Sequence, residues 1–209
     1  MDRQRISYVD PATLEDPAML EELQRCAREG TPRPESSAVR AHVPAVFWSF
    51  ANSWRDVFKN GVCDHAIKEL CRVYVSRSVK CEYCGNQRSM AAAKDGLAEE
   101  DYRALMEFES SSRYDDRQKA ALSLAQAIAW HSDLTDEDWE QLHRHFSEPE
   151  LVELGYFIGL TLGQQSFLRL LNIGHHEVLD LGDASLAPGF ETKEAMAETR
   201  ASEDYWARK

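Results

Sequence analysis

Apolar residues recur along this chain at intervals of three and four positions, which is the spacing of one face of an α-helix. Short polar stretches that contain Gly, Pro, Asn or Asp separate these segments. No stretch alternates apolar and polar residues between hairpin turns. The pattern therefore predicts an all-α protein.

Capping and helix-breaking residues give the expected helix ends. Asp16-Pro17 opens a first helix that ends before Gly30, and residues 31–37 (TPRPESS) are predicted as a loop. An aromatic-rich segment from Ala38 to Lys59 restarts at Pro44, because proline is poorly tolerated inside a helix. Four more helices are predicted over residues 65–79, 81–94, 99–109 and 116–131. Another helix starts at residues 135–138, and a long helix over residues 147–172 opens with a capping box.

The chain is long enough for a single domain with a hydrophobic core. We expect an N-terminal helical extension over residues 1–37, the helical domain over 38–174, and a peripheral C-terminal extension over 175–209. The last segment is rich in charged and small residues and is interrupted by Ala187-Pro188-Gly189.

The net charge is −12, from 36 acidic and 24 basic side chains, and such a surface repels nucleic acids and anionic membranes. We expect a cytoplasmic protein, since the sequence has neither an apolar run of membrane-spanning length nor a secretory signal. Thiols stay reduced in that compartment. The five cysteines are then free, metal-bound or catalytic rather than a structural disulfide framework.

Cys81 and Cys84 are the least random feature of the sequence. Two cysteines three positions apart can close a short disulfide, and the N–H groups of a helix N-terminus stabilise a thiolate there. A zinc site would need two more ligands, and Cys63 and Cys71 do not have the spacing of a second metal-binding pair. A thioredoxin-like site would need a βαβ unit, which the helical pattern excludes.

Two charged residues stand at helical distances from this pair. Glu69 lies twelve positions before Cys81, and Arg88 lies four positions after Cys84. On one continuous helix Cys84 and Arg88 share a face, and an antiparallel neighbouring helix would bring Glu69 to the same place. The alternative is that Glu69 is a solvent-exposed partner of Lys68 or Arg72 and that Arg88 is an ordinary surface residue.

Other candidate features have structural explanations. His143 and His145 point to different faces of a helix, and His175-His176 is typical of a helix C-terminus, so we expect no metal site and no cofactor. Gly155, Gly159 and Gly163 predict that another helix packs closely against one face of the last helix. The aromatic run from Phe47 to Phe58 is expected in the core or a subunit interface.

Several motifs together resemble a known family. They are His42-x-Pro44, the Gly61 turn, Lys68-Glu69-Leu70, Cys81-Glu82-Tyr83-Cys84, Arg88-Ser89 and Gly96-Leu97. In this order they are similar to the carboxymuconolactone decarboxylase superfamily, in its alkyl hydroperoxidase D (AhpD)-like branch. The similarity runs from about Ala41 to Leu97 and continues more weakly from Asp136 to Asn172.

This resemblance implies an all-helical homo-oligomer with its site near a subunit contact. It implies a peroxidase that uses a hydroperoxide as substrate and a dithiol or partner protein as reductant. Cys84 would be the peroxidatic thiol, and Cys81 the resolving thiol, exposed to the reductant. Glu69 would be the general base.

Arg88 stands where the family has a relay histidine, and Tyr83 where some members have another histidine. Arginine can stabilise a thiolate, but it does not release its proton at any working pH. Loss of one acid–base group slows a reaction by roughly ten- to ten-thousand-fold. Two alternatives stay open: a carboxymuconolactone decarboxylase-like lyase that does not use the cysteines, and a non-catalytic, redox-sensing oligomeric protein.

Overall fold

The computed structural model describes residues 4–173 and Leu186. Within these residues the protein consists of helices joined by short turns, which confirms the all-α prediction. The α-helices are α1 (Pro17–Glu29), α2 (Pro34–Arg40), α3 (Pro44–Ser53), α4 (His65–Ser78), α5 (Glu82–Gly85), α6 (Met90–Lys94), α7 (Glu99–Arg103), α8 (Asp116–Trp130), α9 (Asp136–His145) and α10 (Glu148–Leu171). Shorter turns are the 3₁₀-helices η1 (Pro11–Thr13) and η3 (Leu105–Glu107) and the π-helix η2 (Trp54–Lys59).

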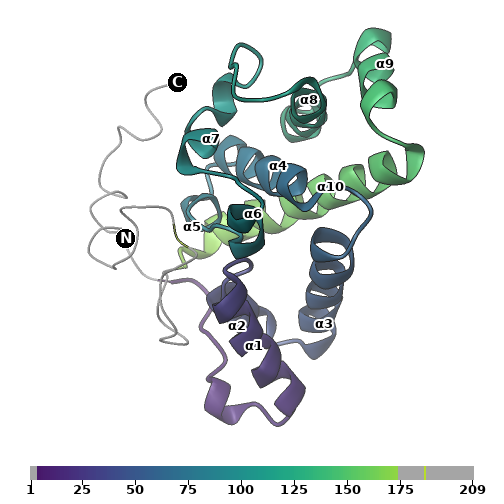
Figure 1. Ribbon diagram of the computed structural model, residues 1–209. Helices are drawn as coiled ribbons and strands as arrows, with labels where there is room; N and C mark the ends of the chain where they lie inside the picture. The colour runs from purple at the N-terminus through teal and green to yellow at the C-terminus, as the bar shows by residue number, and fades with distance from the viewer. Residues whose placement is uncertain (1–3, 174–185, 187–209) are drawn as a thin grey trace.

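Helix α4 lies at the centre of the fold and packs against both α8 and α10. Figure 1 shows α10 crossing the middle of the molecule, with α8 and α9 above it and α1, α2 and α3 below it in this view. The main core lies between α4, α8 and α10 and is filled by aliphatic and aromatic side chains, among them Leu70, Tyr74, Leu122 and Leu154. The same arrangement places α5 and α6 beside α4, where the cysteine pair lies.

The structure confirms the starts of α1 and α10 and the end of α1 that the capping residues predict. The Asp16 side chain accepts a hydrogen bond from the Ala18 N–H, and Gly30 ends α1 with a φ of 90°. At the start of α10, the N–H and hydroxyl groups of Ser147 both donate to the Glu150 carboxylate, at 2.8 Å and 2.7 Å. These contacts satisfy groups that the first turn of a helix leaves unpaired.

A buried ion pair joins α4 to α10. The Lys68 ammonium donates to Glu153 at 2.7 Å, and Glu153 also accepts from the N–H groups of Val62 (2.6 Å) and Cys63 (3.0 Å). A Cβ at Gly61 would overlap the Glu153 oxygens, so a larger residue there would displace this carboxylate. The turn before α4 is therefore held by α10.

Three helix boundaries differ from the prediction. Residues 31–37 are not all loop, since Pro34 starts α2. The helix expected over residues 81–94 is divided into α5 and α6, and the one expected over 99–109 is divided into α7 and η3. The first of these divisions lies inside the candidate site and is explained there.

The glycine stripe on α10 is open. A Cβ at Gly155, Gly159 or Gly163 would have no atom within 4 Å, so the predicted close contact with another helix is not made within the described chain. The predicted C-terminal extension and His175-His176 lie outside the described residues, apart from Leu186, whose backbone pairs with Gln87. Among the residues described, no helix has the length and apolar character needed to cross a membrane.

A candidate redox site at the start of helix α5

Cys81 and Cys84 follow a left-handed turn at Lys80 (φ 58°), directly after α4. Cys81 is the N-cap residue of α5, and its carbonyl accepts hydrogen bonds from the N–H groups of Cys84 (3.1 Å) and Gly85 (2.9 Å). The two sulfur atoms form a disulfide, with an S–S distance of 2.00 Å and a Cα–Cα distance of 5.3 Å. The predicted location of the pair at a helix N-terminus is confirmed.

The disulfide is enclosed by the rest of the chain. Cys81 is 0% exposed and Cys84 is 2% exposed, and both pack with Val39 of α2 and Leu168 and Leu171 of α10. The predicted exposure of Cys81 is therefore wrong for this disulfide form. A reductant could attack the bond only after some of these neighbours have moved.

Glu69 and Arg72 form a buried ion pair one turn apart on α4. The Arg72 guanidinium donates from Nε to Oε2 of Glu69 (2.6 Å) and from Nη2 to Oε1 (2.8 Å). Oε1 also accepts the N–H of Ser89 at 2.9 Å. The interpretation of Glu69 as a solvent-exposed residue is wrong, because the pair is almost completely buried.

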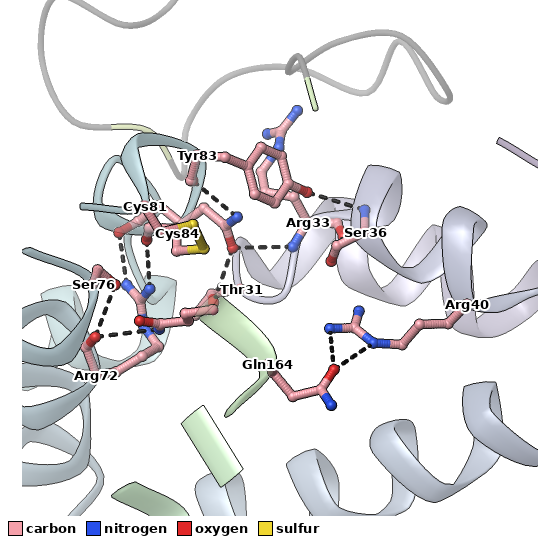
Figure 2. Close-up of a disulfide and its surroundings, with 12 residues drawn as sticks. Thr31, Arg33, Ser36, Arg40, Arg72, Ser76, Cys81, Tyr83, Cys84 and Gln164 are labelled. Atoms are coloured by element: carbon pink, nitrogen blue, oxygen red, sulfur yellow. Dashed lines mark hydrogen bonds between the residues drawn. A yellow bond between two sulfur atoms is a disulfide. The ribbon is translucent and has the colours of Figure 1, made fainter. Parts of the chain in front are cut away.

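Arg72 links this carboxylate to the cysteine turn. Its Nη1 donates to the Cys84 carbonyl (2.7 Å), and its Nη2 donates to the Gln87 carbonyl (2.8 Å), as part of the network in Figure 2. In a continuous helix the Cys84 carbonyl would accept the N–H of Arg88, four residues later. Because Arg72 binds that carbonyl and Glu69 binds the Ser89 N–H, the helix predicted over 81–94 stops at Gly85 and restarts at Met90.

Arg88 consequently does not share a helix face with Cys84. Its guanidinium forms a bidentate pair with Glu99 (2.7 Å and 3.0 Å), donates to the Gly85 carbonyl (2.7 Å), and lies 4.1 Å from the ring centroid of Tyr102. The predicted single cluster of thiol, carboxylate and cation is thus corrected. In the structure Glu69 reaches the Cys84 backbone through Arg72, and Arg88 braces the turn that follows.

The segment assigned to an N-terminal extension also contacts the site. The Tyr83 hydroxyl donates to Glu35 (3.2 Å) and accepts the N–H of Ser36 (3.1 Å), and burial raises the pKa of Tyr83 well above its ordinary value of 10. The Gln87 amide oxygen accepts from the Thr31 hydroxyl at 3.2 Å. Figure 2 shows Thr31, Ser36 and Tyr83 around the disulfide. Residues 31–36 therefore belong to the wall of the site.

A small cavity of about 20 Å³ lies beside Cys84. Its wall combines polar side chains from α2, α4 and α10 with the aromatic rings of Phe50 and Trp54. The polar members of this wall include Arg40, Arg72, Gln164 and Gln165. Of the two cysteines in the disulfide, Cys84 is therefore the one that lines this cavity.

The other three cysteines lie in different surroundings. Cys26, Cys63 and Cys71 are free and buried. Burial raises the pKa of Cys63 to about 11 and that of Cys26 to about 12, and it raises the pKa of Cys71 further. None of the three packs in the cluster that contains the disulfide, and within the described residues no group of three or more His, Cys, Asp or Glu side chains could hold a metal ion.

A family model for carboxymuconolactone decarboxylase matches residues 44–127, which include α4, the cysteine turn and most of α8. This segment of the chain is therefore similar to the carboxymuconolactone decarboxylase family. The resemblance found in the sequence is thereby confirmed. No curated protein sequence matches the chain.

Solved structures share the AhpD-like fold at low sequence identity. A debrominase named Bmp8 is 19% identical, with a TM-score of 0.65, and the match covers 81% of this chain and 89% of Bmp8. An uncharacterized peroxidase-related protein from Ralstonia eutropha, described as an alkylhydroperoxidase AhpD core, is 18% identical with a TM-score of 0.62, covering 79% of this chain and 87% of that one.

A third neighbour is a protein of unknown function from Agrobacterium tumefaciens, named as a candidate AhpD antioxidant defence protein. It is 21% identical with a TM-score of 0.56, and the match covers 66% of this chain and 94% of that one. These matches confirm the fold as AhpD-like. They extend the similarity beyond the residues that the family model covers.

Sequence reasoning missed the residues that connect the site. Arg72 was considered only as a surface partner of Glu69, although their spacing on α4 permits the pair that is observed. The sequence around Arg40 and Gln165 does not indicate a place in the site, because these residues come near Cys84 only when α2, α5 and α10 pack together.

Proposed function

We propose that this protein is a thiol-dependent hydroperoxide reductase in which Cys81 and Cys84 alternate between a dithiol and a disulfide. The observation that carries the proposal is a disulfide at the N-terminus of α5 whose second cysteine lines a small cavity. Helix N-termini favour a thiolate over a thiol, which is the reactive form. The similarity to this family and the AhpD-like fold support the same function.

The proposed cycle begins with the reduced pair. The Cys84 thiolate attacks the terminal oxygen of a hydroperoxide, an S–O bond forms, the O–O bond breaks, and the departing alkoxide takes a proton to become an alcohol. Cys81 then attacks the Cys84 sulfur, and water leaves as the disulfide forms. A cytoplasmic dithiol or reductant protein supplies two electrons and two protons to restore the pair.

The charged neighbours have positioning roles in this proposal. Glu69 orients Arg72, and Arg72 holds the Cys84 carbonyl at 2.7 Å, so this ion pair sets the position of the peroxidatic cysteine. Arg88 holds the turn after α5 through the Gly85 carbonyl and Glu99. A general-base role for Glu69 requires that, in the reduced form, the carboxylate lie within hydrogen-bonding reach of the thiol.

The test is consumption of cumene hydroperoxide with a dithiol reductant. We expect the Cys84→Ser variant to show only the background rate, and the Cys81→Ser variant to accumulate a sulfenic acid that dimedone traps. Cys63→Ser is the matched control, because this buried thiol lies outside the disulfide cluster, and it should retain the wild-type rate.

Equal rates for wild type and Cys84→Ser would reject the peroxidase. If the disulfide forms and reopens without peroxide consumption, the redox-sensor alternative is favoured. Turnover of a muconolactone that persists when both cysteines are replaced by serine would favour the lyase.

A second candidate reaction uses the same cysteine pair. Bmp8 is a debrominase with a similar fold, and a variant of it has been solved with bound 2,3,4-tribromopyrrole. A thiolate could remove bromine from a bromopyrrole by forming an S–Br bond while the ring carbon takes a proton, and the second thiolate would then release bromide as the disulfide closes. Bromide release from 2,3,4-tribromopyrrole by wild type but not by Cys84→Ser would identify this activity.

A further inference from the structure

The cavity beside Cys84 is small and its wall is chemically specific. Its volume of about 20 Å³ admits a group of about one to two heavy atoms. Cys84 lies on one side, and Arg40 and Gln165 contribute polar side chains from α2 and α10. Cys84, an arginine and a glutamine thus line the same space.

Arg40 is a buried cation with an unused donor. It is 7% exposed, and its Nε and Nη2 atoms donate to the amide oxygen of Gln164, at 3.2 Å and 3.0 Å, as Figure 2 shows. Its guanidinium lies 3.6 Å from the centroid of the Phe50 ring, whereas Nη1 has no hydrogen-bond partner. No ion pair found within residues 4–173 includes Arg40.

Such a cation is costly to bury unless negative charge comes near it. Burial lowers the pKa of Arg40 to about 10, so the side chain stays protonated at neutral pH. In the disulfide form neither sulfur is charged. Reduction to a Cys84 thiolate, or cleavage of an O–O bond beside it, would supply the missing negative charge.

Gln165 has a hydrogen-bond acceptor without a partner, whereas Arg40 has a donor without one. It is 4% exposed, and its Nε2 atom donates to the Arg72 carbonyl at 3.3 Å, while its Oε1 atom has no partner. Buried amide oxygens are normally hydrogen-bonded. Two residues that line the cavity with Cys84 therefore carry a buried donor and a buried acceptor without hydrogen-bond partners.

We propose that Arg40 and Gln165 bind the peroxide group of the substrate, so that its terminal oxygen faces Cys84. The Arg40 Nη1–H would donate to the oxygen that leaves, and the terminal O–H would donate to Gln165 Oε1. When the thiolate attacks, negative charge develops on the leaving oxygen next to the guanidinium. This inference rests on the proposed function and adds the residues that bind the substrate. The hydroperoxide enters with its O–O–H end first, and its organic group stays outside the cavity.

The inference is tested by two reactions of the reduced protein. One is oxidation of Cys84 by cumene hydroperoxide in a single turnover, and the other is alkylation of Cys84 by iodoacetamide, which requires the thiolate but no peroxide group. We expect Arg40→Met to slow oxidation about 10- to 100-fold, the usual effect of losing a charged hydrogen bond. Alkylation should slow much less.

Two further variants separate binding from folding. Arg40→Lys keeps the charge and should recover most of the oxidation rate. Gln165→Met removes the acceptor together with the amide that donates to the Arg72 carbonyl, and it should slow oxidation without changing alkylation. Arg28→Met is the matched control, since Arg28 is exposed on α1 and does not line this cavity. If Arg40→Met fails to fold, Gln165→Met alone still decides the role of the subsite.

The outcomes are distinguishable. If oxidation in Arg40→Met and Gln165→Met equals that in Arg28→Met, the subsite is overturned while the peroxidase stands. A parallel fall in oxidation and alkylation would also overturn it, because the residues would then act on the thiolate or the fold. If the wild type is alkylated but not oxidised by the hydroperoxide, the proposed function itself fails and this inference fails with it.

Discussion

At the scale of residues, the protein divides its five cysteines into two chemical classes. Cys81 and Cys84 are placed at the N-terminus of a helix, where a thiolate is favoured. Cys26, Cys63 and Cys71 are buried away from them, and burial raises the pKa of each. The five cysteines thus differ in bonding, since two form the disulfide and three are free.

This division predicts the pattern of alkylation. With a pKa of about 11, less than about 1% of Cys63 is thiolate at pH 8, and the fractions for Cys26 and Cys71 are smaller. After reduction, iodoacetamide at pH 8 should modify Cys81 and Cys84 and leave the other three unmodified, as judged by peptide mass spectrometry. The denatured protein, in which all five should react, is the control. Rapid modification of native Cys63 or Cys71 would contradict the prediction.

The Glu69–Arg72 pair is expected to contribute to folding as well as to the site. Removing one partner of a buried ion pair leaves the other charge unpaired and destabilises a protein by about 3–5 kcal/mol. We therefore expect Glu69→Gln to lower the free energy of unfolding by about that amount in urea denaturation.

The Glu100–Arg103 pair is a matched control. It has the same spacing along a helix, but its two side chains are 51% and 69% exposed. Glu100→Gln should change stability by less than about 0.5 kcal/mol. Equal effects of the two variants would mean that the buried pair adds no stability, and a loss of activity in Glu69→Gln could then be attributed to chemistry alone.

At the scale of elements, a carboxylate at the start of α10 makes the free energy of unfolding depend on pH. A hydrogen bond from Arg117, together with those from Ser147, lowers the pKa of Glu150 from 4.5 to about 2. A carboxyl whose pKa is lowered by folding stabilises the protein above its unfolded pKa, and this contribution disappears as the pH falls through the folded value. The relevant window is therefore pH 4.5 to 2.

We expect Glu150→Gln to destabilise the protein by up to about 1 kcal/mol at pH 7, because glutamine still serves in a capping box but loses the charge that pairs with Arg117. The difference between wild type and variant should shrink as the pH falls from about 4.5 to about 2. Urea denaturation at several pH values measures it. Glu148→Gln, at an exposed neighbouring position, should have little effect at any pH. A difference that does not depend on pH would contradict the assignment.

At the scale of the whole molecule, α10 presents an apolar stripe that no part of the described chain covers. Val152, Tyr156, Phe167 and Leu170 are between 47% and 73% exposed. Gly159 and Gly163 lie between them at intervals of three and four residues, and a Cβ at either glycine would meet open space. Such spacing is typical of a helix face that packs against another helix.

We therefore predict that this stripe forms the contact between copies of the chain in the expected homo-oligomer. Gly159→Glu should produce monomers in light scattering while leaving the thermal unfolding of the monomer fold unchanged, because a Cβ at this position has open space. Arg169→Glu introduces the same side chain at an exposed position of α10 outside the stripe, and it should remain oligomeric. A wild-type protein that is monomeric at micromolar concentration would refute the prediction.

Local chemistry was enough to predict much of this protein. The helical class, the ends of α1 and α10, and the position of Cys81 at a helix N-terminus follow from spacing, proline, glycine and capping residues, whose effects act within one or two turns. The family resemblance adds the order of the cysteine and glutamate motifs. These features do not depend on distant parts of the chain.

Tertiary contacts decided the rest. The break between α5 and α6 arises because Arg72 and Glu69, from α4, bind the Cys84 carbonyl and the Ser89 N–H that a continuous helix would use. The burial of Cys81 and the meeting of Arg40, Gln165 and Cys84 depend on how α2, α5 and α10 pack. Hydrogen bonds and charges from other helices override local preference at these positions, and no pattern along the sequence encodes them.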